Sequence, residues 1–339
     1  MLNITNIYFN DCTPAIAMLV IKNGVVVNSS VYGAARLEKG RCLLKANSNT
    51  AFNICCMNQH ITAAAILFLE ESGKLLIDNH IGMYLPDLPN ELANVTIREL
   101  IFHISGLEDY THNCNLYEFE NNIQNGIIYD KQKIYSEILN LKTTENKGKF
   151  AHCRSGYFLL SLIIESVSGL MYFDFLKQSI FRNIVLDNTF MVQDYHNHDN
   201  YAEPYDLWPT FKPINWIKVI HPLGEGGLMM SINDFASWVK ALISDKVFNQ
   251  SDTLEKFLSF EHSNKQDEFL KDYKVGYGLL NFEESYKDKK YNLISHAGWM
   301  PGSTSLFGRV IIDTDEYWVA YFSNSMTSFS LFDILELCL

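Results

Sequence analysis

The chain has 339 residues, 47% hydrophobic and 19% charged, which is an ordinary composition for a globular protein with a substantial core. Its formal net charge of -12 argues against nucleic acid as a partner, because phosphate binding needs clustered Lys and Arg. The N-terminal residues lack the basic and apolar regions of a secretory signal, and no apolar run approaches the ~20 residues that span a bilayer. We therefore expect no membrane partner.

The seven cysteines are an odd number, and their spacing matches neither a zinc ribbon nor a disulfide framework. Free thiols are typical of a reducing compartment. The cysteine pattern therefore predicts a cytoplasmic protein that holds no metal and no cofactor.

A β-hairpin is predicted near the N-terminus. Ala15–Ile21 and Val25–Tyr32 are apolar, β-branched runs, and the Asn-Gly pair between them is the strongest short signal for a hairpin turn. An amphipathic helix then follows Cys56, and Gly73 ends it.

The middle of the chain is predicted to be mainly helical. One helix starts in Val95–Ile101, and the apolar pattern from Gly156 to Ser168 predicts a buried helix. A glycine-rich run at 224–227 lacks the strand, helix and Lys of a phosphate-binding loop, so we interpret it as a structural turn before another amphipathic helix at Asn233–Ile243.

The C-terminal part returns to strands. Val275–Asn281, Thr304–Ile312 and Tyr317–Ser323 are predicted strands, and Phe329–Leu337 is a predicted closing helix. Strands near both chain ends with helices between them predict an α/β fold in which one antiparallel sheet is built from both ends and flanked by helices. We expect residues 1–84 and 208–339 to form this sheet domain, and 85–207 to form a helical insertion lobe.

The segment at Cys56 carries the most informative motif. It reads Phe52-Asn53-Ile54-Cys55-Cys56-Met57-Asn58-Gln59. It resembles the Phe-x-Ile-Gly-Ser-x-x-Lys motif of the serine β-lactamase and penicillin-binding-protein-like family, which includes class C β-lactamases, D-alanyl-D-alanine peptidases, esterases and transacylases. The resemblance puts Cys56 on the nucleophilic serine and Gln59 on the lysine.

Other segments extend this resemblance over nearly the whole chain and imply the serine β-lactamase-like fold. They resemble the family's Ile-Arg-x-Leu-Leu-x-His-Thr-Ser-Gly-Leu run, its Tyr-x-Asn motif, its glycine pair before a helix, and its His/Lys-x-Gly motif. In this sequence they read Ile97-Arg98-Glu99-Leu100-Ile101-Phe102-His103-Ile104-Ser105-Gly106-Leu107, His152-Cys153-Arg154, Gly226-Gly227 and His296-Ala297-Gly298.

The departures from the family pattern fall on the reacting groups. Cys56 replaces the serine, Gln59 the lysine, His152 the tyrosine and Arg154 the asparagine. A thiol needs less activation than a hydroxyl, since its free pKa of ~8.5 is lowered at a helix N-terminus or beside a protonated histidine. Cys56 with His152 as its base is therefore a predicted cysteine–histidine pair for acyl transfer.

The resemblance also implies how substrate is held. The backbone N–H groups of Cys56 and Trp299 would form the oxyanion hole, and His296 and Gly298 would line the cleft. Gln59 lies on the same helix face as Cys56 and would orient the substrate carbonyl or the imidazole. Arg154 suits a carboxylate or phosphate of the substrate, with a salt bridge inside the helical lobe as the alternative.

Each assignment has a rival. Cys55 is the shifted alternative as nucleophile, although its match to the family glycine favours packing, and His296 and His60 follow His152 as candidate bases. A metal site from Cys56, His60, His152 and Cys153 has poor zinc spacing. His196 and His198 are expected in a solvated loop.

These observations predict a cytoplasmic acyl-transfer enzyme, a transacylase or a hydrolase-type tailoring enzyme, that forms a thioester on Cys56. Its substrate would be a small-molecule or carrier-linked acyl group. The alternative is an inactive β-lactamase-like pseudoenzyme that acts as a binding or regulatory protein. The sequence leaves the acyl donor, the acceptor and the oligomeric state open.

Overall fold

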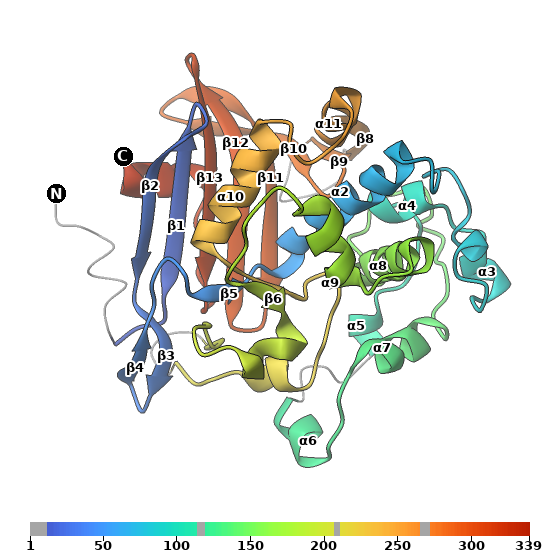
Figure 1. Ribbon diagram of the computed structural model, residues 1–339, viewed down its shortest axis with the longest axis horizontal. Coiled ribbons are helices and arrows are strands. Elements are labelled where there is room, and N and C mark those ends of the chain that lie inside the picture. The colour runs from blue at the N-terminus through green and yellow to red at the C-terminus, as the bar shows by residue number, and fades with distance from the viewer. Residues whose placement is uncertain (1–11, 114–118, 207–210, 265–271) are drawn as a thin grey trace.

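A computed structural model describes residues 12–113, 119–206, 211–264 and 272–339. In these residues the central sheet has eight strands in the order β2-β1-β13-β12-β11-β10-β9-β8, all antiparallel to their neighbours (Figure 1). The strands are β1 (Ile16–Lys22), β2 (Val25–Tyr32), β8 (Phe260–Asn264), β9 (Tyr273–Gly276), β10 (Leu280–Tyr286), β11 (Lys289–Met300), β12 (Ser303–Ile312) and β13 (Asp315–Ser323). The two chain ends thus meet where β1 pairs with β13, which confirms the predicted α/β fold.

The N-terminal hairpin forms as its sequence predicts. Asn23 and Gly24 both have positive φ, 48° and 80°, which is the backbone that a two-residue hairpin turn requires and that Asn and Gly adopt at least cost. β1 is buried over almost its whole length because it lies inside the sheet, between β2 and β13.

The sheet separates two hydrophobic cores. Ala17, Leu19 and Ile21 of β1 face the larger core, which includes α10 (Ile232–Ile243), while Ile16, Met18 and Val20 face the smaller core under α12 (Leu331–Cys338). The period-two alternation of a strand produces this division, so β1 has an apolar residue at every position.

Most remaining helices gather beyond the β11 side of the sheet (Figure 1). They are α2 (Asn58–Glu71), α3 (Asn90–Ala93), α4 (Ile97–Ile101), α5 (Tyr110–Asn113), α6 (Phe119–Gln124), α7 (Lys131–Ile138), α8 (Arg154–Ser168), α9 (Tyr172–Phe175) and α11 (Ser251–Phe257). The predicted insertion limits at 207 and 208 lie outside the described residues, so the division into domains stays a prediction.

Three details differ from the sequence prediction. The expected strand at 275–281 is two strands, because the chain turns at Gly278, where φ is +67° and a Cβ would lie 2.6 Å from the His60 Cα. The apolar pattern did not predict β8 or β11, although the family resemblance placed the His296-Ala297-Gly298 motif of β11 beside Cys56. Two smaller sheets were also missed, β3 (Ala34–Glu38) with β4 (Arg41–Lys45), and β5 (Ala51–Asn53) with β7 (Leu228–Ser231) and β6 (Thr189–Met191).

In the described residues no single helix has the length and apolar content to cross a membrane. One bent pair, α8 with the segment Tyr172–Ile180, meets that test only when its two parts are taken together across a 68° bend.

The end of β11 determines where the Cys56 segment lies. Gly298 packs directly against this segment, and a Cβ there would meet Ser305 Oγ at 2.4 Å, Cys55 Cβ at 2.7 Å and Ile54 O at 2.9 Å. The Ser305 hydroxyl also donates a 2.7 Å hydrogen bond to Ile54 O. The absence of a side chain at Gly298 is therefore required for the sheet to hold this segment.

Gly298→Ala is expected to destabilise the protein by about 1–3 kcal/mol, since an added methyl group in a filled site forces its neighbours apart. Urea unfolding of the variant and wild type measures the difference. The control is Ala297→Ser, at the exposed neighbouring position on the same strand, which should unfold like wild type. An unchanged midpoint for Gly298→Ala would show that this contact is not tight.

Candidate functional site

Cys56 lies in a short 3-10 helix, η1 (Cys55–Met57), which leads directly into α2. Its side chain is only 5% exposed, and its thiol donates to Trp299 O of β11 at 3.8 Å. The predicted position of Cys56 at the start of a helix beside the sheet is therefore what the structure shows.

The surroundings of the Cys56 sulfur favour its ionised form. Burial alone would raise the pKa of the thiol, but a hydrogen bond with His152, the charges of Arg154 and His152, and a backbone hydrogen bond from Trp299 lower it to about 6. A thiol with such a pKa is mainly thiolate at neutral pH, and the thiolate is the nucleophilic form of cysteine.

Arg154 supplies the positive charge beside this sulfur. It is the first residue of α8, its backbone N–H donates to Asp109 Oδ2 at 2.8 Å, and its guanidinium donates to Trp299 O at 3.3 Å. Burial alone would lower the pKa of Arg154, but the negative charges of Cys56 and Asp109 raise it above its usual range. Among the described residues it makes no salt bridge within the helical lobe, which was the alternative role for this arginine.

Gln59 connects two histidines, His152 and His103. It lies on α2, is fully buried, and its amide nitrogen is 3.2 Å from His152 Nε2 while its amide oxygen is 3.2 Å from His103 Nε2. The rings of His103 and His152 lie close together, with centroids 4.7 Å apart. Gln59 therefore contacts the predicted imidazole, and it also contacts a second imidazole that the sequence analysis did not assign to the site.

His296 and Gly298 also lie here, both on β11. His296 is 9% exposed, and its Nδ1–H donates to Gly278 O at 2.6 Å. Burial, together with the nearby His152, lowers its pKa to about 4, so the ring is neutral at neutral pH. Gly298 acts through packing against Cys55, as described above.

Cys55 does not have the surroundings of a nucleophile. Its sulfur points to the backbone oxygens of Asn53 and Ser303, each 3.6 Å away, and burial raises its pKa well above the usual range. Its φ of 53° explains the match to a family glycine, since this left-handed backbone is the one that glycine adopts most readily.

His60 is held in the core rather than in the site. Its Nδ1 hydrogen-bonds to Met57 O, and its Nε2 accepts a 2.9 Å hydrogen bond from the Trp238 indole. Burial lowers its pKa to about 3. Both ring nitrogens are occupied, so His60 is not available as a base for Cys56.

The four residues considered as metal ligands, Cys56, His60, His152 and Cys153, do not assemble into a metal site. In the part of the chain that the structure describes, no group of three His, Cys, Asp or Glu side chains is arranged to hold a metal ion. The Cys153 thiol donates instead to Glu108 O at 3.6 Å, and burial raises its pKa to about 12.

Two groups near the site were missed from the sequence. His103 belongs to the quoted His-x-Ser-Gly-Leu run, which marked the segment but not the contact with Gln59. Glu225, from the glycine-rich turn, is 1% exposed and accepts hydrogen bonds from Tyr110 at 3.1 Å and from the Leu223 N–H at 3.0 Å. Burial raises its pKa to about 8 despite these bonds, so it is mainly neutral at pH 7.

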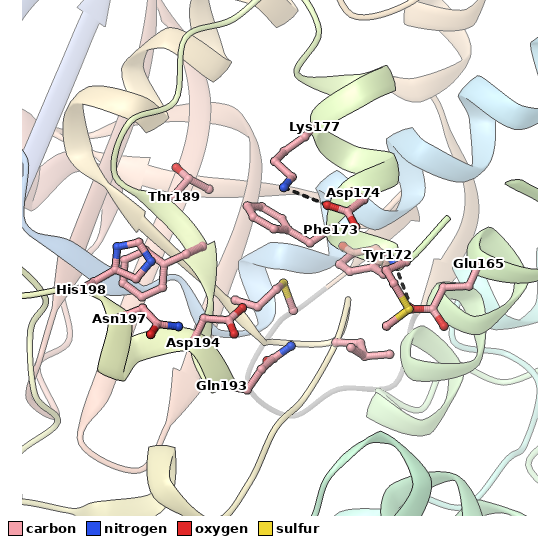
Figure 2. Close-up of a pocket in the computed structure, with 14 residues that line it drawn as sticks. Glu165, Tyr172, Phe173, Asp174, Lys177, Thr189, Gln193, Asp194, Asn197 and His198 are labelled. Atoms are coloured by element: carbon pink, nitrogen blue, oxygen red, sulfur yellow. Dashed lines mark hydrogen bonds and ion pairs between the residues drawn. The ribbon is translucent and has the colours of Figure 1, made fainter. Parts of the chain in front are cut away.

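A separate cavity of about 580 Å³ lies between the α8–α9 region and residues 189–198 (Figure 2). No residue of the cluster around Cys56 lines it. His196 is exposed, as expected, near the end of a 3-10 helix, whereas His198 is half-buried and stacks on Phe190 with ring centroids 3.6 Å apart. Lys177 in its wall is paired with Asp174 at 2.8 Å, so these charges neutralise each other.

Comparison with known proteins agrees with the observed fold. The family model described as Beta-lactamase matches residues 9–335. The chain belongs to the beta-lactamase family. Penicillin-binding protein 4* of Bacillus subtilis is 27% identical over 311 residues, which cover 87% of this chain and 65% of that protein. The putative penicillin-binding protein PbpX of the same species is 26% identical over 68% of this chain and 56% of its own length. The chain thus spans between about half and two thirds of the length of these curated relatives.

Solved structures show the same fold. The octameric penicillin-binding protein homologue from Pyrococcus abyssi has a TM-score of 0.74 at 22% identity, with 92% of this chain and 70% of that chain covered. The D-amino acid amidase from Ochrobactrum anthropi, complexed with L-phenylalanine amide, has a TM-score of 0.71 at 20% identity, with 95% and 90% covered. These likenesses confirm the β-lactamase-like fold.

Alkylation by iodoacetamide should be fastest at Cys56, and its rate should reach half of its maximum at a pH of about 6. Arg154→Gln should raise that midpoint because the thiolate loses its cationic neighbour, whereas Arg154→Lys keeps the charge and should shift it less. Peptide mass spectrometry at each pH measures the rates, with Cys153 as the internal unreactive thiol. A Cys56 midpoint of about 8.5, that of a free thiol, would favour the pseudoenzyme interpretation.

His60→Gln should make stability less sensitive to acid. Because the folded pKa of His60 lies below the 6.5 of the free side chain, only the unfolded chain takes up this proton as the pH falls from 6.5 toward 3, and wild-type stability falls in that window. Between these pH values the free energy of unfolding of the variant should fall by about 1.4 kcal/mol per pH unit less than that of wild type. Urea unfolding at several pH values measures it, with the exposed His112→Gln as control. Equal slopes for His60→Gln and wild type would contradict the buried neutral ring.

Proposed function

We propose that the protein is a cysteine-dependent acyltransferase that forms a thioester on Cys56. The observation that carries the proposal is the environment of the Cys56 sulfur, where His152, Arg154 and Trp299 lower the pKa of a buried thiol to about 6. A structural cysteine in an apolar core has the opposite shift, as Cys55 and Cys153 both have.

The reaction follows from these positions. The Cys56 thiolate attacks the acyl carbon, and in this proposal the Trp299 and Cys56 backbone N–H groups stabilise the oxyanion that forms. The oxyanion then re-forms the carbonyl, the leaving group departs with the electron pair of its bond, and the acyl group remains as a thioester on Cys56. An acceptor attacks this thioester and releases Cys56 as thiolate.

The substrate in this proposal is a small-molecule or carrier-linked acyl group. Thioesters exchange readily with thiolates, so an acyl thioester is a natural donor for a cysteine nucleophile. A cytoplasmic location is part of the proposal, because a reducing compartment keeps a low-pKa thiol available.

A non-catalytic binding or regulatory protein is the rival function. It is favoured by the loss of the family's lysine and tyrosine, which leaves the chain without the usual activation of a serine. The ionised sulfur at the serine's position argues against it, because a binding cleft has no need of a nucleophile there.

Cys56→Ser should abolish acylation, because Gln59 carries no titrating group that would take the proton from a hydroxyl. The protein would be incubated with p-nitrophenyl acetate and with an S-acyl N-acetylcysteamine thioester, and intact mass would record the acyl adduct. Cys55→Ser is the matched control at the adjacent position and should still be acylated. A Cys56→Ser protein that forms the same adduct at the wild-type rate would remove Cys56 as the nucleophile.

A further inference from the structure

The cavity between α9 and residues 189–198 lies apart from Cys56, and the proposed reaction does not use it (Figure 2). Its volume of about 580 Å³ falls within the usual range of small-molecule sites, about 300–1,000 Å³. Cys56, His152 and Arg154 do not line it, so a molecule held there is not the acyl substrate.

One part of the cavity lining is apolar and largely aromatic. Phe190 and His198 form a stacked pair in one wall, with ring centroids 3.6 Å apart and an interplanar angle of 5°. Aromatic faces and adaptable thioethers pack well against a planar apolar molecule. The apolar lining residues are Met171, Tyr172, Phe173, Phe190, Met191 and Leu223.

The charged side chains of the lining leave one carboxylate without a cation. Asp174 pairs with Lys177 at 2.8 Å. Glu165 pairs with Lys131 at 2.9 Å. Asp194, the third acidic residue of the lining, makes no hydrogen bond and no ion pair with any residue that the structure describes.

The histidine whose pKa Asp194 affects does not balance this charge. Burial lowers the pKa of His221, although the nearby Asp130 and Asp194 act in the opposite direction, so its imidazole is mainly neutral at pH 7. Asp194 itself is only half-buried. The cavity therefore has one negative charge that a ligand could pair with.

Gln193 adds a second acceptor beside this carboxylate. Both side chains extend from η4 (Val192–Asn197) toward the wall that contains α9 (Figure 2). The Gln193 amide oxygen is buried without a hydrogen-bond partner in the described part of the chain, which is destabilising for a polar atom. A small rotation of this side chain toward a ligand N–H would satisfy that oxygen, so both residues favour a ligand that donates.

We propose that this cavity binds a small organic ammonium ion with a planar apolar body. A primary ammonium group has three N–H donors, enough for both Asp194 and Gln193. The body of the ligand packs against the aromatic and thioether lining. A carboxylate ligand would face Asp194 with a like charge, and a neutral ligand would leave Asp194 unpaired.

Three probes that share an indole ring test the charge preference. Tryptamine is the ammonium, tryptophol replaces it with a hydroxyl group, and indole-3-acetate carries a carboxylate. In protein labelled with ¹³C-methyl methionine, tryptamine should shift the Met171 and Met191 signals saturably, tryptophol more weakly and indole-3-acetate least. Met171→Leu and Met191→Leu, which nearly conserve volume, assign the signals. Met18, in the core under α12 on the other side of the sheet, should not shift.

Asp194→Asn keeps the shape of the side chain and removes its charge. It should weaken tryptamine binding at least about 10-fold, because charge-assisted hydrogen bonds are about twice as strong as neutral ones. Tryptophol binding should change little, which also shows that the variant is folded. Asp199→Asn is the matched control, since Asp199 is exposed and does not line the cavity, and it should bind tryptamine like wild type.

The measurement needs no activity, so it stands apart from the proposed acyl transfer. No saturable shift of the Met171 and Met191 signals at millimolar tryptamine would overturn the site. Equal affinities for the three probes, or an unchanged tryptamine affinity in Asp194→Asn, would overturn the ligand class.

Discussion

The candidate site depends on the close approach of strand β11 to the segment that carries Cys56. This approach needs a residue without a Cβ at Gly298, because Cys55 and Ile54 occupy the space where that atom would lie. It places the Trp299 backbone beside the Cys56 sulfur and His296 in the wall of the same site. The pairing of β11 with β10 ends at Ser295, whereas residues 296–300 pair with β12, so β12 holds these backbone groups in place before any substrate arrives.

The four substitutions relative to the family motifs form one connected arrangement. Cys56 contacts His152 and Arg154, and Gln59 contacts His152, so each replacement has another replacement as its neighbour. Gln59 is fully buried, and both ends of its amide are hydrogen-bonded. A site that had lost its function by drift would be expected to leave such a buried amide without partners, at a cost of about 1–3 kcal/mol.

The sequence was sufficient to predict those elements that depend on turn-forming residues and on the spacing of apolar residues. The Asn23-Gly24 turn, the doubly buried β1 and the helix after Cys56 all follow from residues close together in the chain. The resemblance to family motifs predicted contacts between distant parts of the chain, including that Cys56 and the end of β11 lie in one site.

The missed features depend on contacts that no local pattern records. β11 begins with two lysines and contains Gly298, which hides its strand character. The chain turns at Gly278 because that residue packs on the His60 backbone, far away in the sequence. His103 was visible as part of a motif, but its role depends on the Cys153 N–H and on Gln59, which only the folded chain brings to it.

The charges around Arg154 explain how a thiolate is stabilised at a buried position. Arg154 lies close to three acidic groups, Cys56, Asp109 and Glu225. If all three were ionised, one guanidinium would face three negative charges in a region of low dielectric.

Burial raises the pKa of Glu225 to about 8 and so keeps that carboxyl mainly neutral at pH 7. The Tyr110 hydroxyl and the Leu223 N–H hold it without requiring its ionisation. The positive charge of Arg154 is then shared only between Asp109, which also accepts the N–H at the start of α8, and the Cys56 sulfur. A neutral Glu225 is therefore part of what allows Cys56 to be the ionised group.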